Sequence, residues 1–203
     1  MWVVKLGGSL QSSSDLSGII SLLAEHGAGR VIIVPGGGSY AEAVREKQKE
    51  LNFSDETAHK LALRAMEIYG AFLLSLDPRL RAADNINSLY PSGDNKIPVW
   101  FPYNMIVNHP GIEASWNVTS DCLSLWLARL LDIKNVLLVK SISPESNDYA
   151  AAALSEAGYI DNAFPQLLAG SGIKPWWCHH TQLGKFTDIL KGNGKVDGLE
   201  LIY

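Results

Sequence analysis

Hydrophobic positions near the start of the chain form continuous apolar runs that are separated by stripes with helical spacing. Val3 and Val4 are β-branched and predict a buried strand next to the N-terminus. The apolar residues that follow fall at i, i+3, i+4 and i+7, which predicts a helix over 15–26: Leu16, Ile19, Ile20 and Leu23. The run over 31–34 is apolar on both faces, as in a central parallel strand. The opening is therefore predicted to be strand, helix, strand with a right-handed crossover.

The same two patterns continue to the end of the chain. Helices are predicted over 40–51, from Ser54 to about Leu76, from Asp121 to about Leu131 and over 149–158. Strands are predicted over 97–101, 135–141, 176–180 and 199–202, the last after a turn at 192–194. The segments 84–96 and 102–116 are predicted to be irregular, and the second is a candidate substrate lid. The mixed charges of 40–51 predict a solvated helix face.

Glycine-rich turns follow the first two predicted strands. The first contains Gly7, Gly8 and Ser9, and the second contains Gly36, Gly37 and Gly38, followed by Ser39 as a candidate N-cap. Carboxyl ends of parallel strands meet at one sheet edge, where ligands of open α/β sheets bind. Glycine lets an anion approach backbone N–H groups closely, and Lys5 adds a positive charge beside the first turn. Two facing anion sites are what phosphoryl transfer requires, although two unrelated tight turns would show the same pattern.

Three further residues are candidates for chemistry at this edge. Asp121 begins a predicted helix and is either a capping acid or an acid that orients Lys5 or a metal. Lys140 ends an apolar strand and therefore points toward the ligand edge. His59 lies on the long helix after Ser54, where a structural role is favoured over a catalytic one.

Composition narrows the class of protein. The chain has 203 residues, of which 47% are hydrophobic, so a single domain with a large core is expected. The net charge of −4 argues against nucleic acid as the main partner. No apolar run approaches the ~18 residues of a membrane span, and no signal peptide is expected. Two cysteines provide neither a disulfide framework nor a metal cluster, which favours the cytoplasm.

The glycine turns fit two kinds of phosphate chemistry. The chain has no G-x-x-x-x-G-K-[ST] motif, so it is not a P-loop NTPase. Residues 36–41 match the dinucleotide pattern G-x-G-x-x-A, which keeps an NAD-dependent oxidoreductase open. Two observations count against it. The pattern follows the second strand of the crossover, and Asp55 and Glu56 begin a helix where an acid at a strand end is required.

Three stretches in order, VVKLGGSL, VPGGGSYAEAV and SWNVTSDCLSLWLA, resemble the amino acid kinase family. That family includes acetylglutamate, aspartate, uridylate and isopentenyl phosphate kinases. The resemblance implies an α/β fold, a three-layer αβα sandwich around a mainly parallel sheet of about eight strands. It also implies one domain over 1–203, with a phosphate and acceptor half over 1–134 and a shortened nucleotide half over 135–203.

Further stretches are similar to a short branch of the family, the [5-(aminomethyl)furan-3-yl]methyl phosphate kinases of methanofuran biosynthesis. They are AHKLA with the following AM, SW with TSD, and IDNAFP over 160–165. The resemblance implies ATP and Mg²⁺, and transfer of a phosphoryl group to a phosphorylated small-molecule acceptor to form a diphosphate. A kinase for an amino acid, uridylate or isopentenyl phosphate, and a non-catalytic ligand-binding subunit, are the alternatives. A homo-oligomer is expected by the same resemblance.

The resemblance also implies roles for individual residues. Lys5 would contact the transferred phosphoryl group, Asp121 would orient the lysines, and Lys140 is the first choice for a second catalytic lysine, ahead of Lys174. Phosphates of ATP would bind at Gly7, Gly8 and Ser9. The acceptor would bind at Gly36, Gly37, Gly38, Asn117 and Ser120. The D-x-D-G segment and the late glycine-methionine-lysine motif found in many relatives are absent from this sequence.

Overall fold

The computed structural model describes residues 1–192 and 199–203, so most of the turn predicted at 192–194 lies outside the described residues. Seven strands form one sheet in the order β3-β4-β2-β1-β5-β6-β7. Their bounds are β1 Trp2–Leu6, β2 Val31–Pro35, β3 Leu80–Ala83, β4 Ile97–Trp100, β5 Asn135–Lys140, β6 Lys174–His179 and β7 Glu200–Leu201. All neighbours are parallel except β6 and β7, which are antiparallel. The predicted α/β class is confirmed, with seven strands in the described part of the chain against about eight expected.

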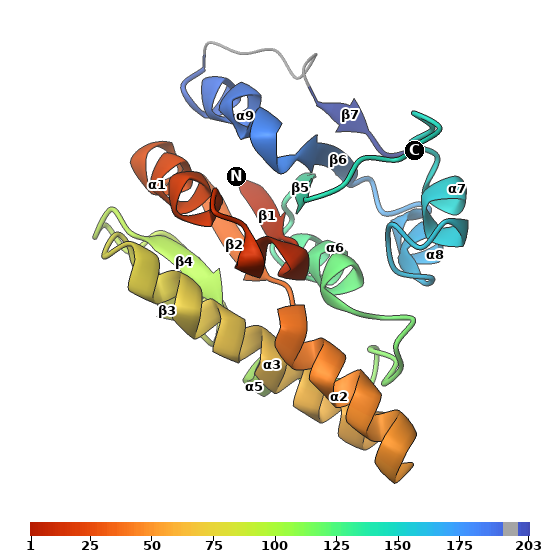
Figure 1. The fold of residues 1–203 in the computed structure, drawn as a ribbon. Coiled ribbons are helices and arrows are strands. Elements are labelled where there is room, and N and C mark those ends of the chain that lie inside the picture. Colours follow the sequence, from red (N-terminus) through yellow and green to blue (C-terminus); the bar gives the residue numbers. More distant parts are fainter. Residues whose placement is uncertain (193–198) are drawn as a thin grey trace.

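Helices cover both faces of the sheet (Figure 1). The longer helices are α1 Leu16–His26, α2 Gly38–Leu51, α3 Asp55–Leu76, α6 Ser120–Leu130 and α9 Leu183–Leu190. The shorter ones are α4 Ile86–Leu89, α5 Tyr103–Ile106, α7 Ala151–Glu156 and α8 Phe164–Leu168, with 3-10 helices η1 Gly8–Ser12 and η2 His180–Gln182. Helices α1 and α9 pack on one face, and α6, α7 and α8 pack on the other. None of the helices described is both long enough and apolar enough to span a bilayer.

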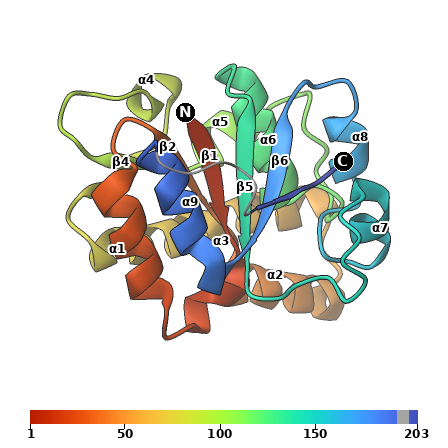
Figure 2. The same ribbon diagram turned by 90° about the horizontal axis from the view of Figure 1, so that it is seen from above.

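The central strand β1 explains why two cores form. It lies between β2 and β5, and Figure 2 shows it beside β5. Side chains alternate along a strand, so Val3 joins the core under α6 while Val4 joins the core under α1. Lys5 is two residues beyond Val3 and therefore faces the α6 side. The same alternation along β5 places Leu138 and Lys140 on that side as well.

Most predicted elements are present, and the differences lie in the middle of the chain. Strand β3 was not expected, because its sequence LRAA has little β-branched or aromatic character. Its residues become a strand through pairing with β4, where Leu80 lies opposite Ile97. The segment predicted to be irregular over 84–96 contains α4, whose Asn85 forms a capping box with Ser88. The segment over 102–116 contains α5.

Candidate active site

The two glycine turns touch each other at the carboxyl edge of the sheet. A Cβ atom on Gly8 would lie 2.3 Å from the backbone N of Gly38, and one on Gly36 would lie 2.6 Å from the N of Gly8. Gly38 also has φ +57, a conformation that other residues rarely adopt. Only glycine fits these positions, because any side chain would push the two turns apart. The prediction that both turns share one sheet edge is therefore confirmed.

The helix after the second turn begins earlier than the sequence suggested. Gly37 occupies the N-cap position of α2, so the prediction that Ser39 caps this helix is wrong. The Ser39 hydroxyl instead donates to Gln11 Oε1 at 3.0 Å, and its backbone N donates to the same oxygen at 3.3 Å. This pair of hydrogen bonds ties the start of α2 to η1, which lies in the other glycine turn.

A buried ion cluster lies beside the turns. Asp121 Oδ1 is 2.8 Å from Lys5 Nζ, and Asp121 Oδ2 accepts a hydrogen bond of 2.7 Å from Lys140 Nζ. The side chains of Lys5 and Asp121 are only 6% and 5% exposed, so they are largely removed from water. Asp121 is presented by the first turn of α6, whereas the two lysines come from adjacent strands. The structure thus brings the three predicted catalytic residues into direct contact.

The environment of the cluster changes its acid–base behaviour. Burial alone would raise the pKa of Asp121, but the ammonium groups of Lys140 and Lys5 outweigh burial and hold that pKa at about 2. Burial lowers the pKa of Lys140 to about 8, against the opposing attraction of Asp121. With both lysines protonated, two positive charges face one negative charge, and the excess is available to an anion.

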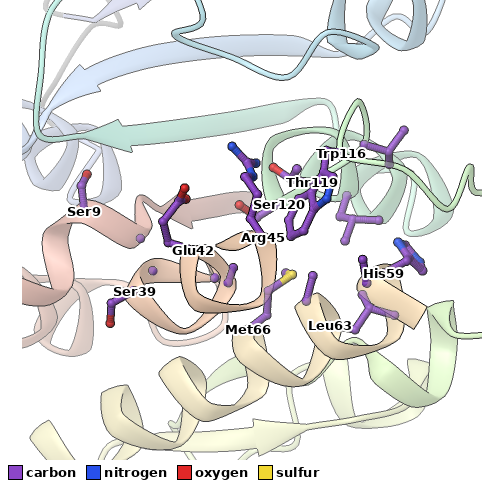
Figure 3. Close-up of a pocket in the computed structure, with 18 of the residues that line it drawn as sticks. Ser9, Ser39, Glu42, Arg45, His59, Leu63, Met66, Trp116, Thr119 and Ser120 are labelled. Carbon is purple, nitrogen blue, oxygen red and sulfur yellow. The ribbon is translucent and has the colours of Figure 1, made fainter. Parts of the chain in front are cut away.

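A cavity of about 430 Å³ opens next to the turns, between α2, α3 and the start of α6. Figure 3 shows Ser9 and Ser39 toward one end of it, and His59 and Trp116 toward the other. Its wall is mostly apolar, with Leu63, Met66 and Leu123 among the lining residues. The predicted residues Gly8, Ser9, Gly37, Gly38 and Ser120 also line this cavity. Asn117 is placed outside it, where its side chain bonds to Glu113 and Asn162.

Several residues of the cavity wall were not predicted from the sequence. Glu42 and Arg45 of α2 line it, although the charges of this helix were predicted only as a solvated face; Glu42 is also exposed, and Arg45 is half-buried. The Arg45 guanidinium lies 4.5 Å from the ring centroid of Trp116, and Trp116 Nε1 donates to Gln48 Oε1 at 2.6 Å. These contacts hold the segment before α6 against α2. No local pattern reveals them, because the partners are about 70 residues apart.

His59 also lines the cavity, although a purely structural role was favoured from the sequence. It is 9% exposed, and burial lowers its pKa, so its imidazole is neutral near pH 7. The sequence feature that pointed to His59 was the stretch AHKLA, which is similar to the [5-(aminomethyl)furan-3-yl]methyl phosphate kinases. The spacing of hydrophobic residues did not point to it.

A second group of polar residues lies at the carboxyl edge of the sheet, next to β5 and β6. The hydroxyls of Ser9 and Ser141 are 2.7 Å apart, and His179 Nε2 lies 3.1 Å from the carbonyl O of Ser141. Lys174, the second choice for a catalytic lysine, begins β6 opposite Asn135, the first residue of β5. It therefore lies at the amino ends of the strands, away from the glycine turns. Within the described residues, no group of three or more His, Cys, Asp or Glu side chains is placed to hold a metal ion.

Comparison with known proteins identifies the fold and its relatives. Residues 1–79 match the amino acid kinase family. Over nearly the whole length, the chain is 27% identical to the [5-(aminomethyl)furan-3-yl]methyl phosphate kinase of Methanocaldococcus jannaschii, covering 97% of this chain and 95% of that protein. The fold is that of the amino acid kinases, and the first 79 residues resemble that family. This similarity supports a phosphotransferase, and ATP is the donor that the amino acid kinase family typically uses.

Solved structures of several kinases share this fold. The uridylate kinase of Archaeoglobus fulgidus superposes with a TM-score of 0.64 at 17% identity, over 95% of this chain and 96% of that one. The UMP kinase of Bacillus anthracis gives a TM-score of 0.65 at 16% identity, over 100% and 98%. A T. acidophilum isopentenyl phosphate kinase in a product complex gives 0.62 at 13% identity, over 100% of both chains.

Proposed function

We propose that this protein transfers the terminal phosphoryl group of ATP to a small acceptor that already carries a phosphate, forming a diphosphate. One observation carries the proposal: two buried lysines share Asp121 at the point where two glycine turns touch. Phosphoryl transfer needs in-line positioning and neutralisation of charge more than it needs a covalent nucleophile. A phosphate acceptor is an anion at neutral pH, so its oxygen attacks without a strong general base.

The roles of the residues follow from their places around the cluster. Lys5 and Lys140 contact the phosphoryl group in transfer, and Asp121 keeps their ammonium groups apart and oriented. Backbone N–H groups at Gly8 and Ser9 hold phosphates of ATP, and those at Gly37 and Gly38 hold the acceptor phosphate, with Ser120 beside it in the cavity wall and Asn117 on the acceptor side outside it. Gly7 and Gly36 shape the turns instead, because their N–H groups donate to the backbone O of Val139 and of Leu6, each at 2.9 Å.

Mg²⁺ would reach the site with ATP. Asp121 faces a lysine at each of its oxygens, so the cluster offers no free carboxylate as a metal ligand. We therefore assign the metal to phosphate oxygens of the nucleotide, as is common for Mg²⁺ in nucleotide sites.

The cavity supports an acceptor of the aminomethylfuran methyl phosphate type. A furan ring fits its mostly apolar wall, where the indole of Trp116 offers a flat surface. Glu42 and Asp55 also line the cavity and would complement an aminomethyl cation. Every residue that lines this cavity precedes position 135, which supports assigning 1–134 to the acceptor half and 135–203 to the nucleotide half.

The test is release of ADP by purified protein with Mg-ATP and a panel of phosphorylated alcohols. The panel includes the aminomethylfuran methyl phosphate, isopentenyl phosphate and UMP. We expect turnover with the first, and at least a thousandfold loss in Lys5→Ala, because the charge acts on the transition state. Lys134→Ala is the matched control, since Lys134 is an exposed lysine paired with Asp132.

One result would change the acceptor, and another would contradict the proposal. Turnover with UMP or isopentenyl phosphate alone would replace the acceptor and keep the kinase. Silence with every acceptor, while ligands still bind, would instead identify a non-catalytic binding subunit.

A further inference from the structure

Asp161 binds the N-terminal end of α6, the helix that presents Asp121. Its Oδ2 accepts hydrogen bonds from the backbone N–H groups of Thr119 at 2.8 Å and Cys122 at 2.9 Å. Its Oδ1 accepts from the Thr119 hydroxyl at 2.6 Å. Three donors from one helix end therefore converge on a carboxylate that lies about 40 residues later in the chain.

These contacts replace the local cap that α6 lacks. Thr119 occupies the N-cap position, but its side chain accepts no hydrogen bond from the helix. The first N–H groups of a helix have no partners within the helix and need an acceptor from elsewhere. A carboxylate at this end also interacts favourably with the helix dipole. Asp161 therefore fixes the first turn of α6, which contains Asp121.

The same short segment also holds Lys140. The backbone O of Tyr159 accepts a hydrogen bond of 2.9 Å from Lys140 Nζ. The ring of Tyr159 packs edge-on against Trp177, with centroids 6.1 Å apart, and the Trp177 ring lies 5.6 Å from Lys140 Nζ. Residues 159–161 thus contact Lys140 of the cluster and the helix end that presents Asp121.

We propose that Asp161 is a positioning residue for phosphoryl transfer, holding the helix end that presents Asp121 and adding a second negative charge near Lys140. This inference rests on the proposed function, because it concerns the same ion cluster. Nothing in the roles carried over from the family resemblance involves Asp161.

The charge of Asp161 has a measurable consequence for Lys140. The groups that face this lysine are Asp121, Lys5, Asp161 and the ring of Trp177. Burial and Lys5 lower the pKa of Lys140, while Asp121 and Asp161 oppose that shift. Burial and the charge of Asp121 raise the pKa of Asp161 itself, although its three donors favour the ionised form. Removing the charge of Asp161 should lower the pKa of Lys140 further.

The decisive variant is Asp161→Asn, which keeps the shape but removes the charge and one acceptor oxygen. We expect kcat to fall by about tenfold or more, as when a charge-assisted hydrogen bond is lost. We also expect the alkaline limb of kcat/KM to move to lower pH, by on the order of one pH unit for a neighbouring charge. If this variant does not fold, Asp161→Ser gives the same comparison of charge, because its hydroxyl is neutral and can accept a hydrogen bond.

Two control variants separate positioning from simple loss of stability. Leu127→Ala removes buried volume from the same helix without changing any charge, so it should destabilise the protein and leave the alkaline limb in place. Asp132→Asn removes an exposed carboxylate just after the other end of α6 and should change neither kcat nor the limb.

A titration of the Lys140 side chain by NMR, without substrate, keeps this inference distinct from the proposed function. A lower Lys140 pKa in Asp161→Asn than in the wild-type protein supports the inference even if no acceptor is phosphorylated. An unchanged Lys140 pKa in Asp161→Asn overturns the effect of the charge on Lys140, and an unchanged kcat overturns the positioning of Asp121. Absence of ADP release from the wild-type protein would reject the proposed function alone.

Discussion

At the scale of single residues, the chemistry of Lys140 depends strongly on its surroundings. An ordinary lysine stays protonated to about pH 10.4, whereas burial lowers the pKa of Lys140 to about 8. A neutral amine offers no positive charge to the phosphoryl group. The rate of the enzyme should therefore depend on pH just above neutrality.

We expect kcat/KM to fall above about pH 8, because this parameter reports ionisation of the free enzyme. The limb of kcat should lie at higher pH, since bound phosphates favour the protonated amine. The measurement is a pH profile of ADP release between pH 6 and pH 10. In Lys140→Arg, the residual activity should lose this limb, because guanidinium stays charged. A value of kcat/KM that stays constant up to pH 10 in the wild-type protein would contradict the prediction.

Asp121 should matter for stability as well as for catalysis. Asp121→Asn removes the carboxylate that both buried ammonium groups contact, and breaking a buried ion pair in this way typically costs about 3–5 kcal/mol. The pKa of Asp121 is depressed in the folded state, so its contribution is present above about pH 4 and is lost as the pH falls toward 2. Urea unfolding at pH 7 and at lower pH measures both effects. Equal stability of Asp121→Asn and wild type at pH 7 would refute this account.

At the scale of elements, the contact between the two glycine turns sets the distance between the two anion sites. A Cβ atom at Gly8 would meet backbone atoms of Gly38 at 2.3 Å and 2.6 Å, and backbone cannot rotate away as a side chain can. Gly8→Ala should therefore separate the turns while leaving both helices formed.

We expect Gly8→Ala to lower kcat by about a hundredfold, since a displacement of about 1 Å between reacting groups has this effect. Steady-state kinetics measure the loss, and circular dichroism checks that the helices remain. Gly18→Ala is the matched control. Gly18 lies in α1 with nothing within 4 Å of an added Cβ, so the change should stabilise the helix by about 0.5–1 kcal/mol and leave kcat unchanged. Full activity in Gly8→Ala would show that the close approach is not needed.

At the scale of the whole molecule, ligand binding and stability should be linked. The cavity is lined by the glycine turns, by α2 and α3 and by the start of α6, so an acceptor would connect elements far apart in the chain. A ligand at a hundred times its Kd adds about 2.7 kcal/mol to the free energy of unfolding. For a chain of this size, that corresponds to a rise in Tm of roughly 5–10 °C.

A thermal shift assay measures this rise with the aminomethylfuran methyl phosphate. The corresponding alcohol without its phosphate is the control and should give little change, because the glycine turns then have no anion to bind. Equal shifts with both compounds would place the binding energy in the apolar wall rather than in the turns.

The elements that were predictable from sequence are those whose pattern is local. The stripe of α1, the apolar runs of β1, β2 and β5, and the Ser54 cap of α3 each depend on residues within a few positions of one another. The order of the glycine turns along the chain also placed them at one edge, because consecutive parallel strands share an orientation.

Other features depend on residues far apart in the chain, which only tertiary packing brings together. Strand β3 exists through its pairing with β4, despite its weak strand propensity. Arg45 reaches the cavity because Trp116 packs against it, and Asp161 caps α6 from about 40 residues away. Lys5, Asp121 and Lys140 were all candidates from the sequence, but the fold decides that one carboxylate faces both lysines. Sequence alone therefore determined the elements and the candidate chemistry, and the tertiary structure decided the partners, because side-chain contacts depend on distance in space.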